Sequence, residues 1–262
     1  EDGTPARSRR VVSVEIATVA FPMTDVGKCP RASEIIDLPG AVTPRLRLLV
    51  KIRTADGSEG EYLGGSESML PQARTAAQRL IGKDAFAREA LYDELKRKLR
   101  KSDRMGVGPI DIALWDLAGK RLSASVAELL GGLRTRLPAY ASTLFGGDGG
   151  GLATPEHYAD FAERCLALGY RAFKVHGWTD GDARREATNV RLLGRRVGER
   201  MALMLDPACW LKTFTDALLV GRACDDAGFF WYEDPYGDGG LSAHGHKRLR
   251  SMIRTPILLG EH

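Results

Sequence analysis

Four short apolar runs in the second half of the chain each lead into a charged residue. These residues are Lys174, Asp206, Glu233 and Glu261, and the intervals between them are 32, 27 and 28 positions (174 to 206, 206 to 233 and 233 to 261). A unit of one strand, one helix and their two connections takes about 30 residues. The spacing therefore predicts consecutive parallel strands, each presenting one polar side chain at its C-terminal end.

The three carboxylates in this series predict a metal site. In a (β/α) barrel the C-terminal ends of successive strands converge on one face, where active sites lie. Carboxylates gathered there raise one another's pKa unless a cation lies between them, and an all-oxygen ligand set suits a hard cation such as Mg²⁺. We therefore predict that Asp206, Glu233 and Glu261 bind one Mg²⁺. The alternative is that they are solvated acids at strand ends.

The composition of the 262 residues argues against several classes of protein. With 44% hydrophobic and 27% charged residues, the chain is expected to form one large domain or two smaller ones. No apolar run approaches the roughly 18 residues of a membrane span, and no apolar signal core follows the polar first ten residues. The net charge is only +4, and basic residues are mixed with acidic ones along the chain. We therefore expect an ordinary solvated surface and no nucleic-acid site.

The cysteines indicate a reducing compartment. Cys29, Cys165, Cys209 and Cys224 have neither the Cys-x-x-Cys spacing of zinc sites nor the pattern of a secreted disulfide framework. We expect free thiols, no zinc and a cytoplasmic location.

The first part of the chain, residues 1–136, is predicted to be an α+β unit of strands followed by helices. Strands are expected at 11–20, 45–54 and 59–63, and helices at 71–81, 84–101, 110–120 and 126–130. The proline- and glycine-containing segment 21–43 between the first two strands is expected to be a long loop that serves as a lid.

The second part, residues 137–262, alternates strands and helices. Its first strand is expected at 137–143, and its helices at 154–168, 181–197, 213–226 and 241–253, the first of them capped by Thr154 with Pro155 following. Five strands are visible where a barrel has eight, and three more units would need about 90–100 residues. Because an open sheet would leave strand edges bare, we expect a truncated or partly observed protein, or completion by another segment.

Taken together, these features resemble the enolase superfamily, on its mandelate racemase side, over nearly the whole sequence. The helix Ile-Asp-Ile-Ala-Leu-Trp-Asp-Leu-Ala-Gly-Lys at 110–120 resembles the family's helix before the barrel. Asp206, Glu233 in Trp-Tyr-Glu-Asp-Pro, and Glu261 match its three Mg²⁺ ligands. The resemblance implies a capping domain followed by a TIM-type barrel, a small-molecule carboxylate substrate and a homo-oligomer.

The chain departs from the family pattern at the positions of the catalytic bases. Lys174-Val-His176 stands where many members have Lys-x-Lys, Asp206 lacks the usual Asn two places on, and the His–Asp dyad of later strands has no counterpart. Lys174 and His176 share parity on a strand and so point to one side. Lys174 could hold a substrate carboxylate or enolate oxygen, or only form a salt bridge to Asp206 or Glu233. His176 could be the general base or could bind a substrate hydroxyl.

Two further residues are substrate-binding candidates. His262 directly follows a predicted ligand, with a dangling terminal residue as the alternative. Trp178 follows the strand that carries Lys174, with packing as the alternative, and packing is also the role we assign to Trp210 and Trp231.

The function implied by the resemblance is Mg²⁺-dependent removal of the proton α to a carboxylate, followed by dehydration of a sugar acid to a 2-keto-3-deoxy acid. The polar His176 and His262 suit a polyol substrate. Three alternatives stay open: a racemase or epimerase of an α-hydroxy acid, a Schiff-base aldolase using Lys174, and an inactive barrel remnant that serves as an interaction subunit.

Overall fold

The structure, a computed structural model, describes residues 7–30, 34–237 and 242–260. The chain forms two compact units. The first comprises residues 1–22 and 44–136, and the second comprises 23–43 and 137–262. Residues 23–43 thus group with the second unit, whereas the sequence analysis placed them in the first.

The first unit is a three-stranded sheet covered by helices. The sheet has the order β1 (Val11–Lys28), β2 (Ile35–Thr54), β3 (Glu59–Gly64), and β3 pairs antiparallel with β2. The remaining elements are η1 (Glu67–Met69), α2 (Leu70–Ala77), α3 (Arg88–Lys98), α4 (Val107–Leu122) and α5 (Val126–Leu129). Alternate β2 residues Leu48, Val50 and Ile52 are fully buried in the same core as the α4 residues Ile110 and Leu117. The predicted α+β character is therefore confirmed.

The expected long loop at 21–43 is wrong, because most of it continues β1 and β2 into a long hairpin. Prolines in this segment misled the prediction. Pro22 lies on the edge strand β1, and Pro39 lies in a part of β2 beyond the stretch 48–53 that pairs with β3. Edge positions tolerate the missing N–H of proline. The end of the hairpin, residues 23–43, belongs to the second unit. There, the backbone N–H of Asp37 donates to the carbonyl oxygen of Phe145 at 2.9 Å.

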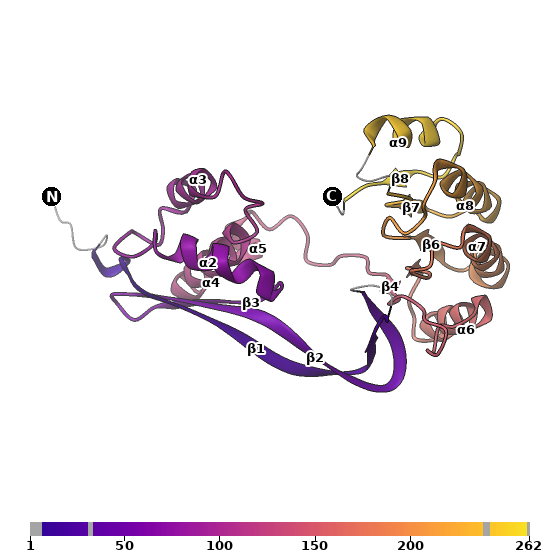
Figure 1. The fold of residues 1–262 in the computed structure, drawn as a ribbon. Helices are drawn as coiled ribbons and strands as arrows, with labels where there is room; N and C mark the ends of the chain where they lie inside the picture. The colour runs from indigo at the N-terminus through magenta and orange to yellow at the C-terminus, as the bar shows by residue number, and fades with distance from the viewer. Residues whose placement is uncertain (1–6, 31–33, 238–241, 261–262) are drawn as a thin grey trace. The chain divides into compact units, whose positions relative to one another are not determined.

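The second unit is a parallel α/β sheet in the order β4-β5-β6-β7-β8, with every adjacent pair parallel. Its strands are β4 (Ala141–Ser142), β5 (Ala172–Val175), β6 (Ala202–Leu205), β7 (Trp231–Glu233) and β8 (Ile257–Leu258). Its helices are α6 (Pro155–Ala167), α7 (Ala183–Val197), α8 (Phe214–Ala227) and α9 (Ala243–Arg250). Figure 1 shows α6, α7 and α8 side by side along one side of the sheet. The five predicted strands and the Thr154 cap of α6 are confirmed, and the architecture corresponds to an incomplete barrel.

Strand periodicity divides the residues of this sheet between two faces. Phe173, Val175, Leu203, Leu205 and Tyr232 are buried in the hydrophobic core shared with α6, α7 and α8. Because successive side chains alternate across a strand, the intervening residues face away from those helices. The opposite face therefore receives Lys174 from β5, Asp206 from the end of β6 and Glu233 from β7.

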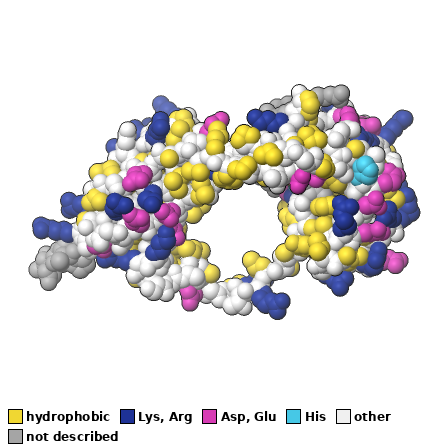
Figure 2. Space-filling view, turned by 90° about the horizontal axis from the view of Figure 1, so that it is seen from below, with side chains coloured by type: hydrophobic (Ala, Val, Ile, Leu, Met, Phe, Trp, Pro, Cys, Tyr) yellow, Lys and Arg dark blue, Asp and Glu magenta, His cyan; other side chains and the backbone are white. Residues whose placement is uncertain are grey.

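On the face shown in Figure 2, basic and acidic side chains are interspersed without a large patch of one sign. Among the described residues, no helix combines the length and apolar character needed to cross a membrane. No disulfide bond joins any of the four cysteines in the described part of the chain.

Candidate active site

The C-terminal ends of β5, β6 and β7 bring together four of the predicted site residues. Lys174 Nζ lies 2.8 Å from Asp206 Oδ2 and 3.1 Å from Glu233 Oε2. His176 Nε2 lies 3.2 Å from the same Asp206 oxygen. The strand register produces this cluster, because Lys174 pairs with Met204, which in turn pairs with Trp231. Asp206 and Glu233 each lie two residues beyond these partners.

Lys174 and Asp206 are both charged in this arrangement. Burial disfavours the charge on Lys174, but its contacts with Asp206 and Glu233 outweigh burial and raise the pKa of the ammonium. Burial likewise acts to raise the pKa of Asp206, but its contacts with His176 and Lys174 outweigh burial and lower that pKa to about 2. The salt bridges that the sequence analysis considered for Lys174 are therefore present.

Thr143, at the end of the first barrel strand, orients His176. The backbone N–H of His176 donates to Thr143 Oγ1 at 3.0 Å, and ring Nδ1 lies 2.7 Å from the Thr143 carbonyl oxygen. A carbonyl oxygen only accepts, so Nδ1 carries a proton and the ring is held with Nε2 toward Asp206. The sequence analysis included Thr143 in a strand but missed this role, because the contact joins residues 33 positions apart.

Asp234 is a further carboxylate that the sequence analysis missed. Oxygen atoms of Asp206, Glu233 and Asp234 lie within 4.8 Å of one another. Asp234 is 2% exposed, and its Oδ1 accepts from the backbone N–H of Gly260 at 3.2 Å. Its position directly after Glu233, in Glu-Asp-Pro, was the available signal. The predicted residues Glu261 and His262 lie outside the described residues.

The residues present fit a divalent cation. Two of the three carboxylates, Asp206 and Asp234, are at least 95% buried, and all three offer the oxygen ligands that Mg²⁺ prefers. Asp206 and Glu233 already share one positive charge, that of Lys174. Asp206 and Glu233 would hold the ion, and Asp234 adds a neighbouring carboxylate.

An open cavity of about 450 Å³ lies over this cluster. Its walls include Thr143 and Phe145 after β4, His176 after β5, and Glu34 and Ile35 from the hairpin end, all of them in the second unit. A volume of this size is in the range of small-molecule sites. The cluster is therefore accessible to a ligand of the size of a sugar acid.

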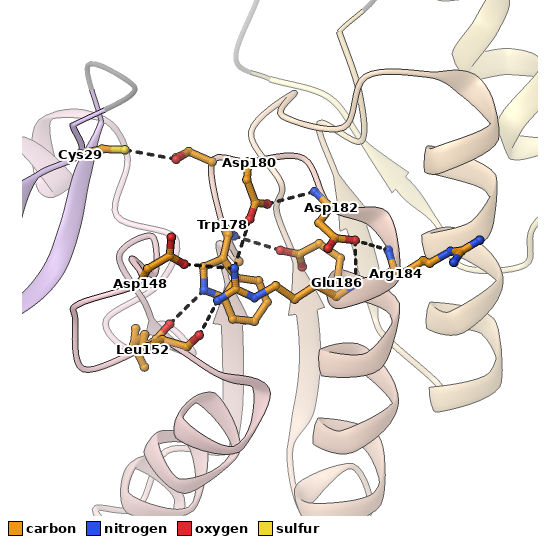
Figure 3. Close-up of polar contacts among 12 residues, drawn as sticks. Cys29, Asp148, Leu152, Trp178, Asp180, Asp182, Arg184 and Glu186 are labelled. Carbon is orange, nitrogen blue, oxygen red and sulfur yellow. Dashed lines mark hydrogen bonds and ion pairs between the residues drawn. The ribbon is translucent and has the colours of Figure 1, made fainter.

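Trp178 belongs to a network of polar contacts around the loop after β5 (Figure 3), and it is not among the residues that line the cavity over Asp206 and Glu233. It is 3% exposed, its indole N–H donates to the Leu152 carbonyl oxygen at 3.1 Å, and the Arg185 guanidinium lies 3.8 Å from its ring centroid. These contacts favour the packing role. Trp178 also lines a second cavity of about 350 Å³, together with Gly146, Gly147 and Gly149, and contact with substrate there stays a prediction.

Glu186 on α7 accepts a hydrogen bond from the same loop. Its Oε1 accepts from the Trp178 backbone N–H at 2.9 Å, and the residue is 2% exposed. Gly177, with φ of +58°, has no room for a side chain, since a Cβ there would collide with the Glu186 carboxyl group. Glycine at 177 therefore lets that carboxyl group approach the loop that follows Lys174 and His176.

We expect Glu186→Gln to change how stability depends on pH. Burial raises the pKa of Glu186 from 4.5 to about 8, against the opposing Trp178 hydrogen bond. Between these values the folded state keeps a proton that the unfolded state releases, so wild-type stability falls as pH rises, by up to about 1.4 kcal/mol per pH unit. The glutamine amide keeps the hydrogen-bond acceptor and does not ionise. The free energy of unfolding of the variant therefore rises relative to that of the wild type between pH 5 and pH 8.

Urea unfolding at several pH values measures this difference. The exposed Glu199→Gln serves as the control and is expected to follow the wild type. Parallel stability curves for Glu186→Gln and the wild type would contradict the prediction.

Comparisons with known proteins agree with this geometry. Residues 157–262 match the family described as Enolase C-terminal domain-like, and residues 40–131 match the Mandelate racemase / muconate lactonizing enzyme, N-terminal domain. The chain is 32% identical over 226 residues to a D-galactarolactone cycloisomerase of Agrobacterium fabrum, covering 83% of this chain and 58% of that protein. It is 28% identical to an L-talarate/galactarate dehydratase of Salmonella typhimurium, covering 82% and 54%.

A solved structure supports the same assignment. The D-glucarate dehydratase of Agrobacterium tumefaciens, complexed with magnesium, matches with a TM-score of 0.83 and 29% identity over 95% of this chain and 66% of that one. The chain thus spans little more than half the length of these two curated relatives. By its matched domains, its fold and its relatives, the chain belongs to the enolase superfamily, in the mandelate racemase-like subgroup.

Proposed function

We propose that this chain carries the Mg²⁺ site of an enzyme that removes the proton α to the carboxylate of a sugar acid. The observation that carries the proposal is the cluster of Asp206, Glu233 and Asp234 beside Lys174 and His176 at one end of a parallel sheet. Relatives named as a sugar-acid dehydratase and a sugar-lactone cycloisomerase support the substrate class.

The proposed ligands are Asp206, Glu233 and, from the sequence pattern, Glu261. When bound, Mg²⁺ supplies Lewis-acid stabilisation of the enediolate that forms when the proton leaves. Lys174 is a buried cation beside the ligands, and it holds an oxygen of the substrate and stabilises negative charge there. Lys174 on β5 and His176 just after it can both contact the substrate, because their side chains point to the same face.

His176 is the proposed acceptor of the α-proton. Thr143 holds its ring, and Nε2 is the nitrogen turned toward the cavity and Asp206. For Nε2 to accept the proton it must carry none itself, which fits a ring whose proton lies on Nδ1 at the Thr143 carbonyl oxygen. The alternative role for His176 is a hydrogen bond to a substrate hydroxyl.

Dehydration is the outcome that we propose after proton removal. The electron pair of the broken C–H bond forms the enediolate, the β-hydroxyl group leaves with a proton as water, and the resulting enol becomes a 2-keto-3-deoxy acid. The match to an L-talarate/galactarate dehydratase supports this outcome. Cycloisomerisation is the second candidate, because the relative with 32% identity is named as a cycloisomerase. A racemase shares the same first step.

The test is a screen of sugar acids and their lactones with Mg²⁺, followed by detection of 2-keto-3-deoxy products. In parallel, exchange of the α-hydrogen in D₂O reports proton removal whatever the outcome. We expect at least one sugar acid to exchange and to lose water, and Glu233→Gln to do neither. Exchange without water loss favours cycloisomerisation or racemisation.

Three results would overturn the proposal. The first is Mg²⁺ affinity that Glu233→Gln leaves unchanged, which removes the metal site. The second is trapping of a keto acid on Lys174 by borohydride, which identifies a Schiff-base aldolase. The third is absence of both turnover and exchange with normal Mg²⁺ binding, which favours an inactive barrel remnant.

A further inference from the structure

Trp231 makes a direct hydrogen bond to a proposed metal ligand. It lies two positions before Glu233 on β7, so both side chains project from the same face of the sheet. Its indole N–H donates to Glu233 Oε2 at 3.0 Å, and Lys174 Nζ lies 3.1 Å from the same oxygen. Within the described part of the chain, both polar contacts of this carboxylate end on Oε2, and neither involves Oε1.

Neighbouring rings hold the indole of Trp231 in place. The Tyr140 ring meets it edge-on, with centroids 5.9 Å apart and planes at 81°, and the Phe230 ring lies at 5.4 Å. Lys174 Nζ also lies 5.9 Å from the Tyr140 centroid. The direction of the Trp231 N–H is therefore set by ring packing, which a flexible donor such as lysine lacks.

We propose that Trp231 is a positioning residue for Glu233, whose carboxylate it holds through Oε2 so that Oε1 is available to a divalent cation. This inference rests on the proposed function, in which Glu233 is a ligand of Mg²⁺. The physical reason is that hydrogen bonds from neighbouring residues orient metal ligands and reduce the rotational freedom lost on binding. The sequence analysis assigned Trp231 to packing alone.

Trp231→Phe separates the two roles, because phenylalanine keeps an aromatic ring between Tyr140 and Phe230 but has no N–H. Calorimetric titration with Mg²⁺ alone is expected to show a Kd weaker by about 10- to 100-fold than that of the wild type, the range typical for lost partners of metal ligands. Trp115→Phe, in α4 of the first unit, is the matched control and is expected to bind Mg²⁺ as the wild type does.

The outcomes distinguish this inference from the proposed function. An unchanged Kd in Trp231→Phe overturns the positioning role and leaves the metal site intact. A wild-type protein that binds no Mg²⁺ overturns both. A loss of affinity in Trp115→Phe equal to that in Trp231→Phe assigns the effect to general damage and also overturns the positioning role.

A second measurement does not depend on the folding of Trp231→Phe. The chain has four tryptophans, so NMR of the wild type gives four indole N–H resonances. Variants with phenylalanine at Trp115, Trp178 and Trp210 assign the Trp231 signal by elimination. We expect this signal to lie downfield, as for a donor to a carboxylate, and to move when Mg²⁺ is added. If the chemical shift of the Trp231 indole N–H does not change on addition of Mg²⁺ while calorimetry records binding, the proposal is overturned.

Discussion

Asp206→Asn is expected to abolish turnover and to weaken Mg²⁺ binding by more than about 100-fold. Loss of a residue that only hydrogen-bonds to a metal ligand costs at most about that much, and loss of a ligand should cost more. Asp206 is 5% exposed, and its pKa of about 2 keeps it ionised at any working pH. It also accepts hydrogen bonds from Lys174 Nζ and the Ala208 backbone N–H, and His176 Nε2 lies 3.2 Å from its Oδ2. Asparagine keeps the volume but removes the negative charge that a divalent cation and the Lys174 ammonium both contact.

Calorimetric titration with Mg²⁺ and assays of α-hydrogen exchange measure the two effects. Asp226→Asn is the matched control, because Asp226 is an exposed carboxylate of α8 whose ion pair with Arg191 spans 3.9 Å. We expect that control to behave as the wild type. Wild-type affinity in Asp206→Asn would remove Asp206 from the ligand set and with it the proposed chemistry.

The Asp206 pKa also implies an acid limit to stability. Because the folded-state pKa lies below the ordinary value of 3.8, ionised Asp206 stabilises the fold above about pH 4, and this contribution is lost as pH falls toward about 2. Asp206→Asn lacks this contribution, so its stability deficit relative to the wild type should shrink over the same interval.

Lys174→Met is expected to be the second severe substitution, through loss of turnover and through lower stability in the absence of Mg²⁺. Lys174 is 8% exposed and lies between Asp206 and Glu233. Removing one partner of a buried ion pair leaves uncompensated charge and typically costs about 3–5 kcal/mol. Methionine fills a similar volume, so the effect isolates the charge.

Mg²⁺ distinguishes the two consequences of Lys174→Met. A divalent cation between the carboxylates replaces the missing charge, so urea unfolding should show that much of the stability returns when Mg²⁺ is added. Turnover should not return, because the positive group that we propose for the substrate is still absent. The exposed Lys212→Met is the control. Full activity of Lys174→Met with Mg²⁺ would limit Lys174 to the salt bridges.

Local patterns in the sequence were sufficient for the elements of the second unit. Thr154 and Pro155 mark the start of α6 where the structure has it, and the spacing of 174, 206 and 233 anticipates three adjacent strand ends. The hairpin was different. Prolines predict a loop when judged locally, and only the sheet order places Pro22 on an edge strand and Pro39 in a part of β2 beyond its pairing with β3.

Sequence alone placed Lys174, His176, Asp206 and Glu233 together at the strand ends, because a two-residue period and a near-constant βα length require no knowledge of any contact, although it missed Asp234. Tertiary structure alone decided what holds them. The contact of Thr143 with His176 joins residues 33 positions apart, and the hydrogen bond from Gly260 to Asp234 joins residues 26 positions apart. Trp231 on Glu233 depends on the direction of a ring packed against Tyr140. Such contacts depend on orientation across neighbouring strands, which no local spacing specifies.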